Sequence, residues 1–237
     1  MGATWQIRTA QGGEQVWDWR AGAPPVAELL PVRRPAAGAM SRHTPVRMAC
    51  MTIGSWLLLE SGLEYEAGRG LDRDPTVDWI AAQPVRLQFD EGPTHIVDLL
   101  ARHRDGSVVL WDVRPDERQD EEFARVADLS RQACSEVGWH YAVHGTPSTA
   151  YRLNLLWLAL FRRPPKWPHH QAAQRLLNVA SGPATIGDLM AIDDGDGHAI
   201  ATMWHLLWTG VLRVDLDERI TPATAVAVTE TQVSDDA

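Results

Sequence analysis

Lysine is almost absent from this chain. Of its 22 basic side chains, 21 are arginines and one is Lys166, so the first 165 residues offer no lysine to a catalytic site. Cysteine is scarce too, since Cys50 and Cys134 are the two thiols among 237 residues. Two cysteines indicate neither a disulfide framework nor a zinc knuckle, and we therefore expect reduced thiols in a cytoplasmic protein.

Long apolar runs and positive net charge are also lacking. No apolar run reaches the roughly 20 residues that span a bilayer, and residues 1–10 do not have the pattern of a signal peptide, so we expect no membrane partner. A formal net charge of −9 argues against a protein that coats DNA by itself. It does not exclude a nuclease, because metal-binding carboxylates add negative charge and partner subunits can carry the affinity for DNA. The apolar fraction of 45% suffices for one large domain or two small ones.

The most informative stretch is residues 94–115, which predict a β-hairpin. Residues 96–101 are apolar and begin with β-branched side chains, as a buried strand does. Asp105 and Gly106 are a strong signal for a tight hairpin turn. Residues 108–113 then predict the second strand of the hairpin.

Two carboxylates interrupt this apolar hairpin, Asp98 on the first strand and Asp112 on the second. Carboxylates are rarely buried unless they are paired or bind metal, and one on each strand can converge on a cation. Arg114 points to the same face as Asp112, because side chains alternate along a strand. Taken alone, the hairpin is equally compatible with a structural role for both carboxylates, since such patterns often arise by chance.

Residues 55–71 precede the hairpin and favour a helix, because leucines recur there at helical spacing. Glu60 and Glu64 would lie one turn apart on one side of this helix. We expect the helix to end before Pro75, since the residue preceding a proline avoids helical geometry. Two strands are expected next, at residues 77–80 and 85–89.

Several motifs in a fixed order resemble the TnsA-like endonuclease subunits of heteromeric transposases. They are E-S-G-L-E-Y-E around Glu64, then L-D-R-D-P-T-V, then A-A-Q-P, then the hairpin with His95 to Asp98 and D-V-R-P at residues 112–115. The last motif is similar to the D-x-R-P of one branch of that family. The family belongs to the restriction-endonuclease-like superfamily with the PD-(D/E)xK signature. The resemblance covers residues 40–165 well and the remainder loosely.

The resemblance implies an α/β fold in which a mixed sheet is flanked by helices. The residues themselves agree, because residues 120–137 predict an amphipathic helix and residues 139–143 a strand. A helix that crosses over from the D-V-R strand to a further strand suits such a sheet. The chain departs from the family at Val97, where the family has proline, and at Tyr65 and Glu66, where it has arginine and aspartate.

The resemblance also implies a site for one or two Mg²⁺ ions, with Mn²⁺ as a substitute. Glu64, Asp98 and Asp112 would ligate the ions together with the Val113 carbonyl, and hard cations prefer such oxygens. Arg114 would take the place of the family's lysine. An arginine stays charged, so it can stabilise phosphate charge but cannot act as a general base.

Two further residues are weaker candidates for this site. Glu60 would lie behind the ligands, although a solvated helix position is an equally good interpretation. Gln83, in the A-A-Q-P motif, would contact the site or DNA.

The activity implied by the resemblance is a cut in one DNA strand, on the 5′ side, at transposon ends. An integrase-class transposase subunit would cut and join the other strand, and an ATPase regulator is a further implied partner. Two alternatives remain: a non-catalytic adaptor that keeps the nuclease fold and docks partners, and a nuclease of another system such as defence. Metal binding discriminates the first interpretation from the adaptor, as does the loss of cutting in Asp98→Ala and Asp112→Ala.

The chain is expected to divide into five segments. These are an N-terminal hairpin with a Pro-rich connector (1–45), a nuclease domain (46–162), a linker (163–171), a winged-helix-like domain (172–229) and a disordered tail (230–237). In the fourth segment Thr185 is expected to cap a short helix. Residues 192–197 predict a turn and not an EF-hand, which needs a glutamate at its twelfth position. A helix at 198–207 lacks arginine, so a docking surface or plain core suits it better than reading DNA.

Overall fold

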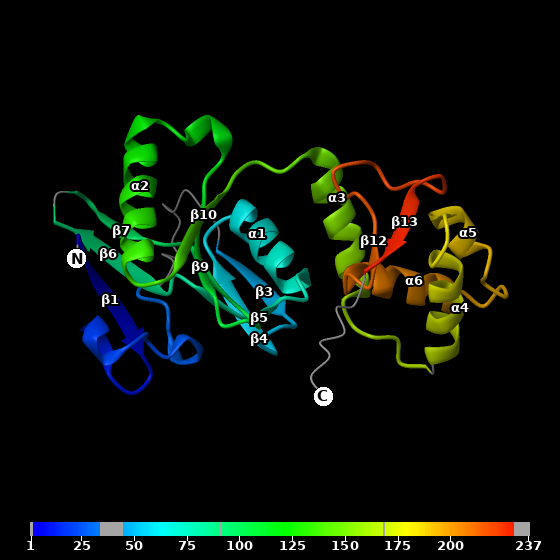
Figure 1. Cartoon of the computed structure of the whole chain (residues 1–237), viewed down its shortest axis with the longest axis horizontal. Coiled ribbons are helices and arrows are strands. Elements are labelled where there is room, and N and C mark those ends of the chain that lie inside the picture. Colours follow the sequence, from blue (N-terminus) through cyan, green and yellow to red (C-terminus); the bar gives the residue numbers. More distant parts are fainter. Residues whose placement is uncertain (1, 34–44, 91, 168, 230–237) are drawn as a thin grey trace. The chain divides into compact units, whose positions relative to one another are not determined.

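The computed structural model describes residues 2–33, 45–90, 92–167 and 169–229, and it has a mixed α/β fold (Figure 1). Two compact units make up the chain. The first unit comprises Met1–Asp72 and Thr76–Thr146, and the second comprises Arg73–Pro75 and Pro147–Ala237. The expected tail at 230–237, and residues 34–44 of the expected connector, lie outside the described residues. None of the described helices combines the length and apolar character needed to cross a membrane.

The central sheet of the first unit has the strand order β10-β9-β8-β5. Its strands are β5 (Val77–Ala82), β8 (Leu99–His103), β9 (Val108–Val113) and β10 (His140–His144). Strands β8 and β9 form the expected antiparallel hairpin, and Gly106 adopts the positive φ of +87° that its tight turn requires. Strand β10 lies parallel to β9, so the chain must cross over between them.

Helix α2 (Glu121–Glu136) makes this crossover and lies against the sheet (Figure 1). It begins where the Asp120 side chain accepts a hydrogen bond from the Phe123 amide, which satisfies one free donor of the first turn. One face is buried, including Val126, Ala127 and Ala133. The sequence predicted this helix and the following strand because apolar spacing is a local signal.

A second sheet in the first unit has the order β2-β1-β6-β7. Its strands are β1 (Ala3–Thr9), β2 (Gly13–Val16), β6 (Val85–Phe89) and β7 (Thr94–Ile96). The expected N-terminal hairpin is present, and β1 pairs antiparallel with β2. Trp19 lies in a 3₁₀ turn, and its ring meets those of Trp5 and Trp139 edge to face at 5.0 and 5.2 Å.

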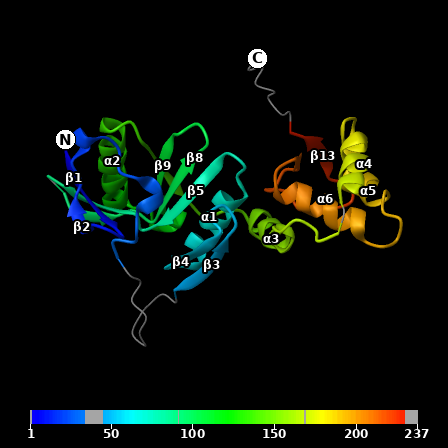
Figure 2. The ribbon, with the colours of Figure 1, turned by 90° about the horizontal axis from the view of Figure 1, so that it is seen from below.

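The expected helix at 55–71 is wrong in its first part. Residues Ser55–Leu59 form strand β4, which pairs antiparallel with β3 (Val46–Cys50), and helix α1 (Gly62–Arg73) begins only afterwards (Figure 2). The side chains of β4 alternate: Leu57 and Leu59 are buried, whereas Trp56 and Leu58 are exposed. This is the period of a strand, whereas the helix was expected from leucines four apart, Leu59 and Leu63, of which only Leu63 lies in α1. Helix α1 ends before Pro75, as predicted.

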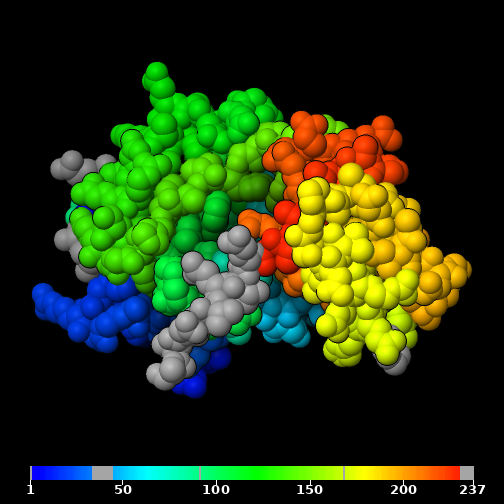
Figure 3. Space-filling view, turned by 45° about the vertical axis from the view of Figure 1, so that its right-hand side comes forward, coloured from blue at the N-terminus to red at the C-terminus, as the bar shows by residue number. Residues whose placement is uncertain are grey.

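The second unit contains helices, two very short strands and one four-residue strand around a core of its own. The elements are α3 (Thr149–Leu158), α4 (His170–Ala180), α5 (Ile186–Met190), α6 (His198–Trp208), β11 (Ala184–Thr185), β12 (Leu212–Arg213) and β13 (Ala225–Val228). The strands form a sheet of order β11-β13-β12. Strand β13 pairs antiparallel with both β11 and β12. Helix α4 contributes to the outer surface of this unit, in yellow in Figure 3.

The second unit also begins earlier than the expected linker at 163–171. Leu155 and Leu158 of α3 are fully buried in the same apolar cluster as Leu176, Met203 and Leu207. Helix α3 therefore belongs to the core of the second unit. The expected nuclease domain ended at residue 162, whereas the first unit ends at Thr146.

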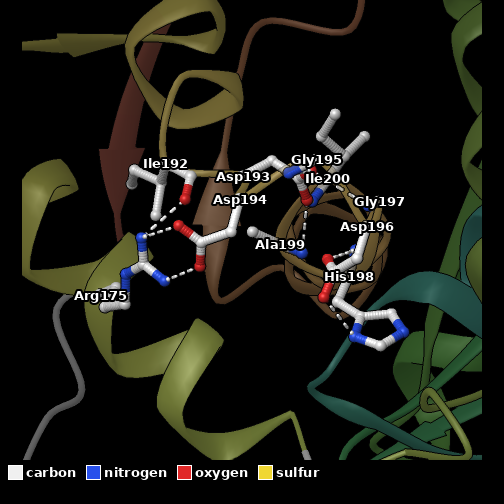
Figure 4. A network of polar contacts seen from close by, with 10 residues as sticks. All are labelled: Arg175, Ile192, Asp193, Asp194, Gly195, Asp196, Gly197, His198, Ala199 and Ile200. Carbon is white, nitrogen blue, oxygen red and sulfur yellow. Dashed lines mark hydrogen bonds and ion pairs between the residues drawn. The ribbon is translucent and has the colours of Figure 1, made fainter.

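The acidic turn before α6 is held by its own hydrogen bonds (Figure 4). The Asp193 carboxylate accepts from the amides of Gly195, Gly197, Ala199 and Ile200, and these bonds lower the pKa of Asp193. Asp194 pairs with Arg175 at 2.7 Å. As expected the segment is a turn, and its carboxylates serve to begin helix α6.

Candidate metal-binding site

The residues singled out by the sequence come together in the first unit. A cavity of about 320 Å³ is lined by Glu64 of α1, Asp98 before β8, and Asp112 and Val113 of β9. Arg114 lines it too, and so does His95 of β7. These residues come from separate elements, and the sheets bring them to one place.

Asp112 is the most deeply buried of the carboxylates, with 1% of its surface exposed. It follows Val108 and Leu110 on the inward face of β9, so it occupies a core position. Its Oδ2 lies 2.7 Å and its Oδ1 2.9 Å from His95 Nε2, and the Tyr141 hydroxyl donates to Oδ2. A buried carboxylate needs such donors, because leaving it unpaired in the core would cost several kcal/mol.

Asp98 is held by the backbone on both sides. The Val113 amide donates to its Oδ2 at 2.8 Å, which ties Asp98 to the strand that carries Asp112. The Gln83 amide donates to the Asp98 carbonyl, also at 2.8 Å. Burial raises the pKa of Asp98 well above its ordinary value, and the negative charges of Asp112 and Glu64 raise it further. Crowded carboxylates of this kind attract a cation.

Glu64 lies in the first turn of α1 and is 5% exposed. Its Oε1 accepts from the Ser61 hydroxyl at 2.9 Å and its Oε2 from the Glu60 amide at 2.8 Å, while Ser61 Oγ accepts from the Glu64 amide. Ser61 thus satisfies a free donor at the helix start, and Glu64 reaches back to the amide of Glu60, one residue before Ser61. Burial raises the pKa of Glu64. Glu64 therefore has a structural role in addition to lining the cavity.

Arg114 lies between this cavity and a neighbouring one of about 180 Å³, which Glu60 and Arg118 also line. Its Nε donates to the Arg118 carbonyl at 2.9 Å, and its guanidinium lies 5.4 Å from the centre of the Phe123 ring. The charge of Arg114 is therefore held at the border of the two cavities. Glu60 accepts a hydrogen bond of 2.9 Å from Arg33, and its negative charge contributes to the raised pKa of Asp98 and Glu64.

Gln83 lies behind the cavity and does not line it. It is 2% exposed and has a positive φ of 48°, which is unusual for a residue with a side chain. Its backbone amide donates to the Asp98 carbonyl, and its backbone carbonyl accepts from the Val32 amide at 2.9 Å. Among the described residues, its side-chain oxygen has no hydrogen-bond partner. Strain and an orphan polar atom at one residue are features that cluster at functional sites.

No role for His95 or Tyr141 was predicted from the sequence. His95 stands three residues before Asp98 in the quoted motif, but its partner in the structure is Asp112. Tyr141 lies on β10, and a buried tyrosine hydroxyl usually needs a partner. Both contacts to Asp112 are distant in the sequence, so local periodicity could not reveal them.

The donor set has the chemistry of a site for a hard divalent cation. It offers carboxylates of Glu64, Asp98 and Asp112, with Val113 beside them, and Mg²⁺ prefers such carboxylate oxygens. In the described parts of the chain no three His, Cys, Asp or Glu side chains are already gathered as a metal-holding group. The oxygens of Glu64 and Asp112 instead accept hydrogen bonds from the protein, so binding would exchange these bonds for metal bonds.

Comparison of the chain with profiles of known protein families finds no matching family. Comparison with characterised proteins finds no match either.

Proposed function

We propose that this chain is a Mg²⁺-dependent DNA endonuclease subunit of a heteromeric transposase, similar to TnsA-like proteins. The observation that carries the proposal is the convergence of Glu64, Asp98 and Asp112 on one cavity. The order of their motifs along the chain, from the helix to the two strands of the hairpin, supports the same assignment.

The proposal includes the fold of each unit. A hairpin followed by a helical crossover to a parallel strand supports a restriction-endonuclease-like domain. In the second unit, three helices followed by the β12 and β13 pair support a winged-helix domain that docks partners. The proposed partners are DNA, an integrase-class transposase subunit and an ATPase regulator, in the cytoplasm.

Each residue has a defined part in the proposed reaction, a hydrolytic cut of one strand on the 5′ side of a transposon end. Glu64, Asp98, Asp112 and the Val113 carbonyl hold the metal, for which Mn²⁺ substitutes. When bound, the ion supplies an activated water and stabilises negative charge on the phosphate. Arg114 stays charged at any working pH, so it orients the phosphate by charge and leaves proton transfer to other groups. Its place between the two cavities suits a contact with the DNA backbone.

The test is a calorimetric titration of Mg²⁺ and Mn²⁺ into the wild type and into Asp112→Ala, with a plasmid-nicking assay beside it. We expect binding that weakens at least about tenfold in the variant, because a ligand is lost. Asp128→Ala is the matched control, since Asp128 is an exposed carboxylate on α2. Circular dichroism shows whether each variant is folded. Asp98→Ala should likewise abolish nicking.

A second candidate function is an adaptor that keeps the nuclease fold without catalysis. One observation favours it: the oxygens of Asp112 and Glu64 already have protein donors in this structure. An adaptor requires no metal. Absence of binding to the wild type, at millimolar metal and with DNA present, would therefore replace the nuclease proposal with this one.

A further inference from the structure

His95 reaches the cavity from a different sheet than the two aspartates. It lies on β7, where its backbone pairs with Leu87 of β6 in the second sheet, whereas Asp112 lies on β9 of the central sheet. Its side chain lines the same cavity as Glu64, Asp98 and Asp112, and about 20% of it is exposed. A nitrogen donor therefore stands among the carboxylates.

The spacing of His95 and Asp112 matches that of two neighbouring metal ligands. His95 Nε2 lies 2.7 and 2.9 Å from the two Asp112 oxygens. In an octahedral site with metal–ligand bonds of about 2.1 Å, ligands at right angles lie about 3 Å apart. An ion bound to both atoms would lie to one side of the line that joins them. The two atoms can therefore keep close to their present spacing, but the His95 ring must turn to aim Nε2 at the ion.

We propose that His95 is a nitrogen ligand of the metal held by Asp112 and Asp98, so that this site favours Mn²⁺ over Mg²⁺. The inference rests on the proposed function, because it assumes that the cavity binds metal. Imidazole is a poor ligand for Mg²⁺, and it suits transition metals better, whereas the carboxylates accept both. Imidazole binds metal through a bare nitrogen, so in the bound state the neutral ring carries its one proton on Nδ1 and presents Nε2 to the ion.

Tyr141 supports the proposed site by contacting Asp112, and it is not itself a metal ligand. Its hydroxyl donates to Asp112 Oδ2. Hydrogen bonds of this kind fix the orientation of a ligand carboxylate. Asp112 would then keep its position while the His95 ring turns to present Nε2 to the ion.

The test compares His95→Gln with the wild type by calorimetric titration of Mn²⁺ and of Mg²⁺. Glutamine retains an amide that can donate to Asp112, but it replaces the nitrogen ligand by an oxygen. We expect the Kd for Mn²⁺ to rise about tenfold or more and the Kd for Mg²⁺ to change much less. His140→Gln is the matched control, because His140 is an exposed histidine on β10.

A spectroscopic measurement keeps the result independent of activity. Pulsed electron paramagnetic resonance of bound Mn²⁺ detects a directly coordinated imidazole nitrogen. We expect this nitrogen signal in the wild type and in His140→Gln, and its loss in His95→Gln.

The outcomes separate this inference from the proposed function. Mn²⁺ that binds in an Asp112-dependent way without a nitrogen signal would overturn the His95 inference and leave the nuclease proposal standing. An equal loss of Mn²⁺ and Mg²⁺ affinity in His95→Gln would also overturn it. Absence of any Asp112-dependent binding in the wild type would overturn both.

Discussion

The Val113 amide donates a hydrogen bond of 2.8 Å to the carboxylate of Asp98. This bond joins the segment before β8 directly to the residue that follows Asp112 on β9. The two aspartates therefore cannot move apart without breaking it, and their negative charges stay close even without a cation. The effect of these two close charges on the stability of the fold can be measured.

Asp98→Asn should stabilise the metal-free protein at neutral pH. Burial and the charges of Asp112 and Glu64 raise the pKa of Asp98 above the value near 3.8 expected in the unfolded chain. A carboxyl with a raised folded pKa favours folding fully only below its unfolded pKa, and that contribution is lost as the pH rises through the folded pKa. Asparagine does not ionise, so the gain in stability of Asp98→Asn over the wild type should grow as the pH rises above about 4.

Thermal unfolding of both proteins between pH 4 and pH 8, in the presence of a chelator, checks this prediction. We expect a gain in Tm of at least about 2 °C for Asp98→Asn at pH 7, shrinking towards pH 4. Added Mn²⁺ should stabilise the wild type and not the variant. Parallel curves for the two proteins across this range would contradict the prediction.

Tyr141→Phe should destabilise the first unit and weaken metal binding. The substitution keeps the ring but removes the hydroxyl donor to Asp112, which is buried. A lost hydrogen bond to a charged, buried acceptor lowers the free energy of unfolding by about 1.5–3 kcal/mol. Urea unfolding followed by tryptophan fluorescence measures this loss, and Tyr65→Phe serves as the control because the Tyr65 ring stacks beside Arg69. An unchanged unfolding midpoint for Tyr141→Phe would show that Asp112 does not depend on this donor.

Gln83→Gly should be more stable than Gln83→Ala, which reverses the usual order for a strand region. Both variants lose the buried amide, but only alanine keeps a Cβ at a φ of 48°. A left-handed conformation costs an ordinary residue about 1–2 kcal/mol, and glycine avoids that cost at some expense in chain entropy. We expect a difference on the order of 1 kcal/mol in favour of glycine.

The matched control for Gln83 is Gln88, an exposed residue on β6. There the normal order should hold, with Gln88→Ala more stable than Gln88→Gly, because glycine weakens a strand. The same order at both positions would mean that Gln83 is not strained.

Local signals explain which parts of the fold could be predicted from the sequence. The β8–β9 hairpin follows from Asp105 and Gly106, and helix α2 follows from its apolar spacing. Strand β4 was missed because Leu59 and Leu63 are four apart, which fits one face of a helix, although Leu59 ends the strand and Leu63 lies in α1. The S-x-x-E pattern of Ser61 and Glu64 would have corrected this error, since this sequence pattern marks a helix start.

The parts that could not be predicted depend on contacts between distant residues. The apolar residues of helix α3 could pack against either unit, and the sequence does not say which core they join. The site carboxylates were predicted from motifs, but their donors His95 and Tyr141 come from other strands, 17 and 29 residues away from Asp112. Such pairings follow from sheet topology, which no periodicity in the sequence encodes.

The strand that carries His95 has a consequence for hydrogen exchange. Strand β7 is three residues long and ends its sheet, bonded on one side to β6. Backbone amides at such an edge open by small local fluctuations and exchange with solvent faster than those of a central strand such as β9. A metal ion bound to both His95 and Asp112 would link β7 to the central sheet. Slower exchange at Thr94–Ile96 on addition of Mn²⁺ would then report binding from the backbone, without reference to any substrate.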